Sequence, residues 1–183
     1  MPLTNMNEAL DTLQRAHEAL RDGRNRVALR DFERAVSLMP DSQEAKAGFV
    51  MALLRLGRIG EAADLCEALF ADQEHPPEWP AYLVRGWLAT ARKDYKSAIA
   101  AYEQATAEPG APAWAYSSLA IAHWRAGDAR GAEETARAAL GRWPGEVGLR
   151  GALCLALLRQ RRRREALRVS YMARDHLSRR SIQ

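Results

Sequence analysis

Four arginines that recur at a fixed spacing have the clearest chemistry in this chain. Arg21 and Arg55 are separated by the same interval as Arg125 and Arg159. A guanidinium group binds a carboxylate through two parallel, charge-assisted hydrogen bonds. The arginine row therefore indicates a surface that holds acidic groups. The alternative is structural, because the helix dipole favours a cation in the last turn of a helix by roughly 0.3–1 kcal/mol.

A second basic feature lies near the C-terminus, where residues 147–183 carry 10 basic and 2 acidic groups. Residues 1–91 carry 10 basic and 14 acidic groups, so the chain is dipolar. The basic end could contact phosphates, an anionic membrane surface or an acidic protein, or it could be the solvated end of the fold. It lacks the interleaved aromatic residues that stack on bases, which disfavours nucleic acid. The patch consists of Arg161, Arg162, Arg163, Arg164 and Arg168.

Metal and nucleophile chemistry find no support in the sequence. No second histidine or cysteine stands at metal-ligand spacing from any of the four histidines, which are His17, His75, His123 and His176. There is no glycine-rich phosphate loop or nucleophile elbow. Glu133 and Glu134 are expected to be a solvated pair at a helix start rather than an acid–base dyad. We therefore expect a protein that is not an enzyme and has no metal or cofactor.

An internal repeat sets the positions of these side chains. Alanine recurs at nearly equal intervals, at Ala28, Ala62, Ala98, Ala132 and Ala166. Five positions before it, three of the five repeats have glycine, which suits a sharp helix exit. Mostly small or apolar residues follow at four and seven positions, on one helical face. A period of about 34 residues is typical of helix–turn–helix repeats and predicts five helix hairpins.

Five hairpins account for nearly all 183 residues and predict one all-α domain covering residues 1–183. No stretch of 18 or more apolar residues occurs, so membrane insertion is not expected. The first residues lack the basic region and apolar core of a signal peptide, which favours a cytoplasmic protein. The expected repeats are residues 9–42, 43–78, 79–112, 113–146 and 147–178, with a short tail at 179–183.

The chain resembles the tetratricopeptide repeat family. The segment from Trp114 through Gly127 and Ala132 to Pro144 matches the family pattern best, and the resemblance extends over about residues 9–178. It implies a right-handed superhelical solenoid of about five units, in which the first helices of successive units line a concave groove. It also implies that this groove binds an extended or helical segment of another protein.

The groove residues implied by this resemblance stand eleven, eight and seven positions before each repeat's alanine. The first two rows are largely apolar, and the third contains the arginines. Such a stripe suits a peptide with spaced hydrophobic side chains and several carboxylates, with Trp87 and Trp124 as anchors. The predicted groove consists of His17, Leu20, Arg21, Met51, Leu54, Arg55, Trp87, Thr90, Ile121, Trp124, Arg125, Leu155, Leu158 and Arg159.

These patterns predict a non-enzymatic interaction scaffold or chaperone, and the excess of arginine over lysine, 24 to 3, suggests a bacterial source. One alternative is a chaperone similar to the small tetratricopeptide chaperones of type III secretion translocators. Another is an adaptor that uses the basic C-terminal repeat to bind nucleic acid or an anionic surface. Leu167, Val169 and Met172 form an apolar flank on the last repeat, and a homodimer contact there is a further hypothesis.

Overall fold

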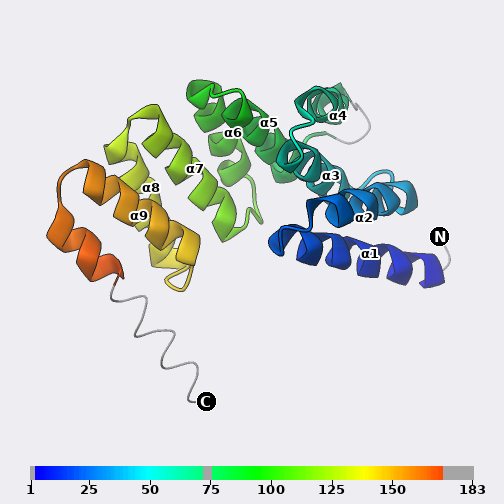
Figure 1. Ribbon diagram of the computed structural model, residues 1–183, viewed down its shortest axis with the longest axis horizontal. Coiled ribbons are helices and arrows are strands. Elements are labelled where there is room, and N and C mark those ends of the chain that lie inside the picture. Colours follow the sequence, from blue (N-terminus) through cyan, green and yellow to red (C-terminus); the bar gives the residue numbers. More distant parts are fainter. Residues whose placement is uncertain (1–2, 72–75, 171–183) are drawn as a thin grey trace, which may run out of the picture. The chain divides into compact units, whose positions relative to one another are not determined.

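The computed structural model describes residues 3–71 and 76–170, with side chains from residue 6 onward (Figure 1). In this part of the chain every regular element is an α-helix, which confirms the predicted all-α fold. The helices form two compact units, Met1–Lys93 and Asp94–Gln183. Among the helices of the described residues, none has both the length and the apolar character needed to cross a bilayer.

The first unit consists of hairpins and a final single helix. α1 packs on α2, α3 packs on both α2 and α4, and α5 packs on α3 and α4. The first helices of successive repeats, α1, α3 and α5, are therefore neighbours (Figure 1). The five helices are α1 (Leu3–Arg21), α2 (Asn25–Leu38), α3 (Gln43–Arg55), α4 (Ile59–Ala71) and α5 (Trp79–Ala91).

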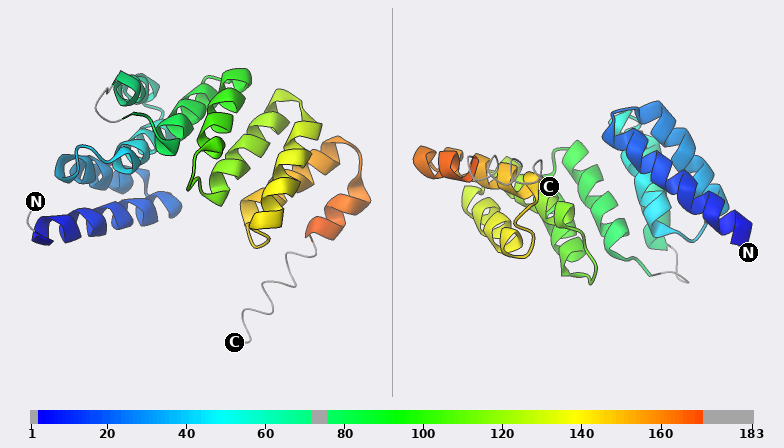
Figure 2. Two further views of the ribbon diagram at one scale, coloured as in Figure 1. Left: turned by 180° about the vertical axis from the view of Figure 1, so that it is seen from behind. Right: turned by 90° about the horizontal axis from the view of Figure 1, so that it is seen from below.

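The second unit continues the same alternation. α6 packs on α7, α8 packs on α7 and α9, and the two first helices α7 and α9 are again in contact (Figure 2). Residues 163–170 are helical as well and follow α9. The other helices of this unit are α6 (Tyr95–Ala107), α7 (Ala113–Ala126), α8 (Ala129–Arg142) and α9 (Val147–Arg159).

The repeated alanines lie on the second helix of each repeat and are buried. Four of them are fully buried, and Ala166 is 4% exposed. The residues twelve positions earlier, on the first helix of each hairpin, are also small, and Ala16, Val50 and Ala120 are completely buried. A small side chain at both positions lets the helices pack closely without a cavity. Within each unit the predicted packing of the hairpins is thus confirmed.

Every hairpin turn has the same left-handed residue, five positions before the alanine. The φ angles are 73° at Gly23, 75° at Gly57, 62° at Lys93, 95° at Gly127 and 63° at Arg161. In the turns at Gly23, Gly57, Gly127 and Arg161 the next residue donates its N–H to a carbonyl in the last turn of the first helix, as in Arg162 to Leu157 at 2.9 Å. This closure recovers an otherwise unsatisfied carbonyl. Lys93 and Arg161 adopt the left-handed conformation despite the steric cost of a Cβ.

Replacing Arg161 with glycine is therefore expected to stabilise the protein by about 0.5–1 kcal/mol, because it removes the strain of a left-handed side chain. Urea unfolding followed by circular dichroism measures this difference. The reverse change, Gly127→Ala, should destabilise the protein by a similar amount, since Gly127 has a φ of 95°. A lower unfolding midpoint for Arg161→Gly would contradict this interpretation of the turn.

Candidate functional site

The predicted groove residues of the first unit lie on α1, α3 and α5, and none of them is fully buried. Arg21 and Arg55, at the C-terminal ends of α1 and α3, are exposed. Leu20, Leu54 and Trp87 are partly exposed, and each also packs against the hydrophobic core. These three side chains therefore combine a structural contact with an accessible apolar surface.

His17 connects two helices on this face of the first unit. Its Nε2 lies 3.4 Å from Oε1 of Glu44 at the start of α3, and its ring meets Phe32 edge-on at 5.1 Å. The interaction with His17 lowers the pKa of the exposed Glu44, so Glu44 is a carboxylate at neutral pH. The face of the first unit thus carries acidic as well as basic groups.

In the second unit the predicted residues lie on α7 and α9, which approach closely. A Cβ placed on Gly148 would come 2.9 Å from Oγ of Ser117, so the glycine allows this approach. Ile121, Trp124 and Leu155 are partly exposed on these helices. Leu158 is 50% exposed, a large value for a leucine. The second unit therefore presents an accessible apolar strip.

Two exposed arginines border this strip, and one has a resolved role. Nη1 of Arg159 donates to the carbonyl oxygen of Trp124 at 3.1 Å, and its Cζ lies 5.9 Å from the centre of the Trp124 ring. Arg159 thus satisfies a carbonyl in the last turn of the neighbouring repeat's helix rather than of its own. A guanidinium group has five N–H donors, so an exposed Arg159 keeps donors for a ligand. Arg125 occupies the equivalent position one repeat earlier, on α7, and is exposed as well.

Two exposed apolar residues extend the same faces but were missing from the prediction. Trp114 is 42% exposed and Leu10 is 52% exposed. They stand seven positions before Ile121 and His17, and this spacing places them on the same helical faces. Extending the rows to eighteen positions before each alanine would have found both. The candidate site therefore reaches the first turn of α7 and the N-terminal half of α1.

The structure divides the predicted basic patch into a paired arginine and exposed ones. Arg162 donates Nε and Nη2 to the two oxygens of Glu165, each at 2.7 Å, and Nη1 to Glu133 at 2.6 Å. Arg161, Arg163, Arg164 and Arg168 are exposed. Arg162 therefore links the fourth and fifth repeats through Glu133.

Glu133 is not the solvated residue that the sequence suggested. Its side chain is only 12% exposed, and it accepts hydrogen bonds from Arg137 and Gln160 as well as from Arg162. Burial opposes its ionisation, but these hydrogen bonds and the charge of Arg162 outweigh burial and lower its pKa. The prediction was wrong because two of the three partners of Glu133 come from the next repeat, 27 and 29 residues later.

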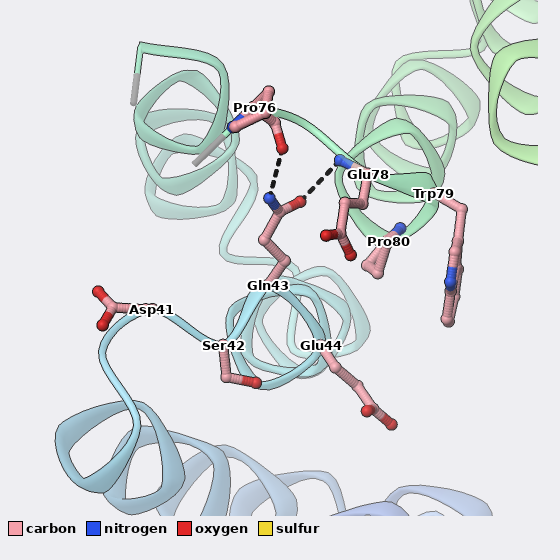
Figure 3. A pocket seen from close by; sticks show the side chains of 8 residues that line it. All are labelled: Asp41, Ser42, Gln43, Glu44, Pro76, Glu78, Trp79 and Pro80. Atoms are coloured by element: carbon pink, nitrogen blue, oxygen red, sulfur yellow. Dashed lines mark hydrogen bonds between the residues drawn. The ribbon is translucent and has the colours of Figure 1, made fainter. Parts of the chain in front are cut away.

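A cavity of about 430 Å³ lies at the start of α3 and α5, surrounded by Asp41, Glu44 and Glu78 (Figure 3). Gln43 extends across it, donating Nε2 to the Pro76 carbonyl at 2.8 Å and accepting the Glu78 N–H at 2.9 Å. Through these two hydrogen bonds, Gln43 links the start of α3 to the segment that precedes α5. Within the described parts of the chain, no three histidine, cysteine or acidic side chains are placed to hold a metal ion.

The two cysteines offer no evidence of a nucleophile. Cys66 is buried and Cys154 is partly buried, and neither forms a disulfide. Burial raises the pKa of both thiols, so the reactive thiolate is disfavoured. Their positions in the structure are those of packing residues.

Comparisons with known proteins agree with this architecture. The family model of the tetratricopeptide repeat matches residues 19–81. A thermophilic tetratricopeptide repeat protein of Thermus thermophilus is 22% identical, with 90% of this chain and 89% of that chain covered and a TM-score of 0.76. MamA of Desulfovibrio magneticus RS-1 is 21% identical, with 91% and 93% covered and a TM-score of 0.63. No curated protein matches the chain. At these identities the solved structures establish a shared fold.

Proposed function

We propose that this chain, which is a tetratricopeptide repeat protein, is an interaction scaffold that binds a segment of a partner protein on the faces of its first helices. The observation that carries the proposal is the accessible strip on α7 and α9. Trp124 and Leu158 present apolar surface there, and Arg125 and Arg159 border it. An apolar strip edged by cations suits a segment that alternates hydrophobic and acidic side chains.

The expected binding energy comes mainly from the apolar strip. Burial of apolar surface contributes roughly 25 cal/mol per Å², and a buried tryptophan is a frequent anchor at interfaces. The arginines add less free energy than orientation and selectivity, because a carboxylate must meet the guanidinium plane in a defined geometry. The strip thus supplies affinity, and the arginines select acidic partners.

The two units are proposed to differ in what they select. The face of the first unit contains the ionised carboxylate of Glu44 beside His17, which disfavours a strongly acidic segment there. At the positions equivalent to Glu44, α7 has Trp114 and α9 has Gly148, and neither is acidic. We therefore assign the acidic preference to α7 and α9. We propose that the protein is a scaffold or chaperone of the cytoplasm that uses no metal or cofactor.

A random peptide library displayed on phage and selected against the purified protein tests the proposal. Selected peptides should be enriched in Leu, Ile, Phe, Asp and Glu, and a second selection against Arg125→Ala/Arg159→Ala should lose the acidic enrichment. Arg130→Ala, an exposed change on α8, is the control and should select the same peptides as the wild type.

Two outcomes would contradict the scaffold proposal. One is a peptide set with no acidic preference that is selected equally by the arginine variant. The other is binding to a random single-stranded oligonucleotide that falls steeply between about 50 and 200 mM salt, which would support the adaptor function instead.

A further inference from the structure

The contact between the fourth and fifth repeats shows which residues of one repeat bind the repeat that follows it. Arg159 reaches the carbonyl of Trp124, and Gln160 reaches the carbonyl of Ala129 at 3.0 Å and the carboxylate of Glu133 at 2.8 Å. Gly148 lies against Ser117. The receiving face of the fourth repeat is therefore Ser117, Trp124, Ala129 and Glu133.

The equivalent positions of the fifth repeat are Gly151, Leu158, Arg163 and Leu167. A Cβ on Gly151 would meet nothing within 4 Å, Leu158 is 50% exposed, and Leu167 is 57% exposed. Arg163, the counterpart of Ala129, is exposed too. Among the described residues nothing packs on this face as the fifth repeat packs on the fourth. We call Gly151, Leu158, Arg163, Arg164 and Leu167 the receiving edge.

The first helix of the fold, α1, has acidic residues where α3 has buried ones. Ala45 and Ala52 of α3 are completely buried against the preceding hairpin. Their counterparts on α1, one repeat earlier, are Asp11, which is exposed, and Glu18, which is partly exposed. Within the described residues neither forms an ion pair, and Glu18 accepts only a hydrogen bond from Gln14 at 3.1 Å. Arg15 lies between them on the same helical face and donates to Thr12 at 3.1 Å, so this face of α1 carries two carboxylates and one cation.

The receiving edge and α1 are complementary in charge and in shape. Arg163 and Arg164 are exposed and form no ion pair with any described residue, in contrast to Arg162. Leu10, the counterpart of Gly148, is 52% exposed and would meet the open space beside Gly151. Two receiving edges would repel each other, because both are basic.

We propose that copies of this chain associate end to end, with the receiving edge of one copy bound to α1 of the next. The interface joins two different surfaces, so it is heterologous and can extend beyond a dimer. This association is separate from partner binding, although Leu158 belongs to both surfaces. Its attraction is largely electrostatic and weakens as salt shortens the Debye length from about 10 Å at 0.1 M to about 3 Å at 1 M.

Sedimentation velocity of the full chain over a wide concentration range tests the proposal. The weight-average sedimentation coefficient of the wild type should rise with concentration, and less so at high salt. Arg163→Glu/Arg164→Glu and Asp11→Arg/Glu18→Arg should each weaken association at least about tenfold. An equimolar mixture of the two variants should associate again, because each reversed end then meets an end of opposite charge.

Arg130→Glu/Arg142→Glu makes the same charge change on α8 and should associate like the wild type. Circular dichroism establishes that each variant is folded, and Asp11→Asn/Glu18→Gln replaces the α1 variant if it is not. A wild type that stays monomeric at every concentration would overturn the proposal. So would association that survives both reversals, or a mixture that fails to recover it.

Discussion

Gly48→Ala is expected to lower the stability of the first unit by about 1–3 kcal/mol, because the added methyl group collides with a ring that cannot move away. A Cβ on Gly48 would lie 2.1 Å from Cε1 and 2.5 Å from Cζ of Phe32. Phe32 is completely buried among alanines of α1, α2 and α3. The gain in helix propensity on replacing glycine, about 1 kcal/mol, offsets only part of the clash.

Substitution of Phe32, the other residue of this contact, should lower the stability even more. Phe32→Ala leaves a cavity in the same cluster and should cost about 3–5 kcal/mol. Phe32→Leu combined with Gly48→Ala should cost less than the sum of the two single changes, because the smaller side chain relieves the clash. Urea unfolding of the wild type, Gly48→Ala, Phe32→Leu and the double variant forms the double-mutant cycle.

Gly60→Ala is the matched control for this experiment. Gly60 lies in α4 of the same unit, and a Cβ there would meet nothing within 4 Å. We expect its stability to be unchanged or slightly raised. If Gly48→Ala were as stable as Gly60→Ala, the close approach of α2 and α3 at Phe32 would be disproved.

Trp124→Ala is expected to weaken binding of a selected peptide by about thirtyfold or more, equivalent to at least about 2 kcal/mol for an interface anchor. The indole lies on the accessible strip and beside the Arg159 guanidinium. Its loss removes apolar contact area and also the aromatic surface next to that cation. Isothermal titration calorimetry or fluorescence polarisation measures the dissociation constant.

Arg159→Lys separates charge from geometry at the same position. Lysine keeps the positive charge but loses the planar fork, so binding of an acidic peptide should weaken while the charge is unchanged. Trp143→Ala removes a tryptophan that packs on Tyr116 and does not belong to α7 or α9, and it should leave peptide affinity unaltered. Equal losses in Trp124→Ala and Trp143→Ala would indicate general destabilisation rather than a binding strip.

Much of the fold was predictable because its determinants are local. The repeat period, the hairpin turns and the buried alanines all follow from spacings within one hairpin, where side chains three, four or seven positions apart must share a face. The candidate rows were predictable for the same reason. The residues of these rows on α7 and α9 are exposed or partly exposed, and their role in binding stays a proposal.

The sequence by itself determined the hairpins, but only the tertiary structure decided which polar groups meet between repeats. Arg161 has a φ of 63° at a turn position where three other repeats have glycine. Glu133 is enclosed by side chains of the following repeat. Arg159 bonds a carbonyl 35 residues earlier. These contacts depend on how closely neighbouring hairpins approach and how they are rotated, and the periodicity of a single helix does not specify either.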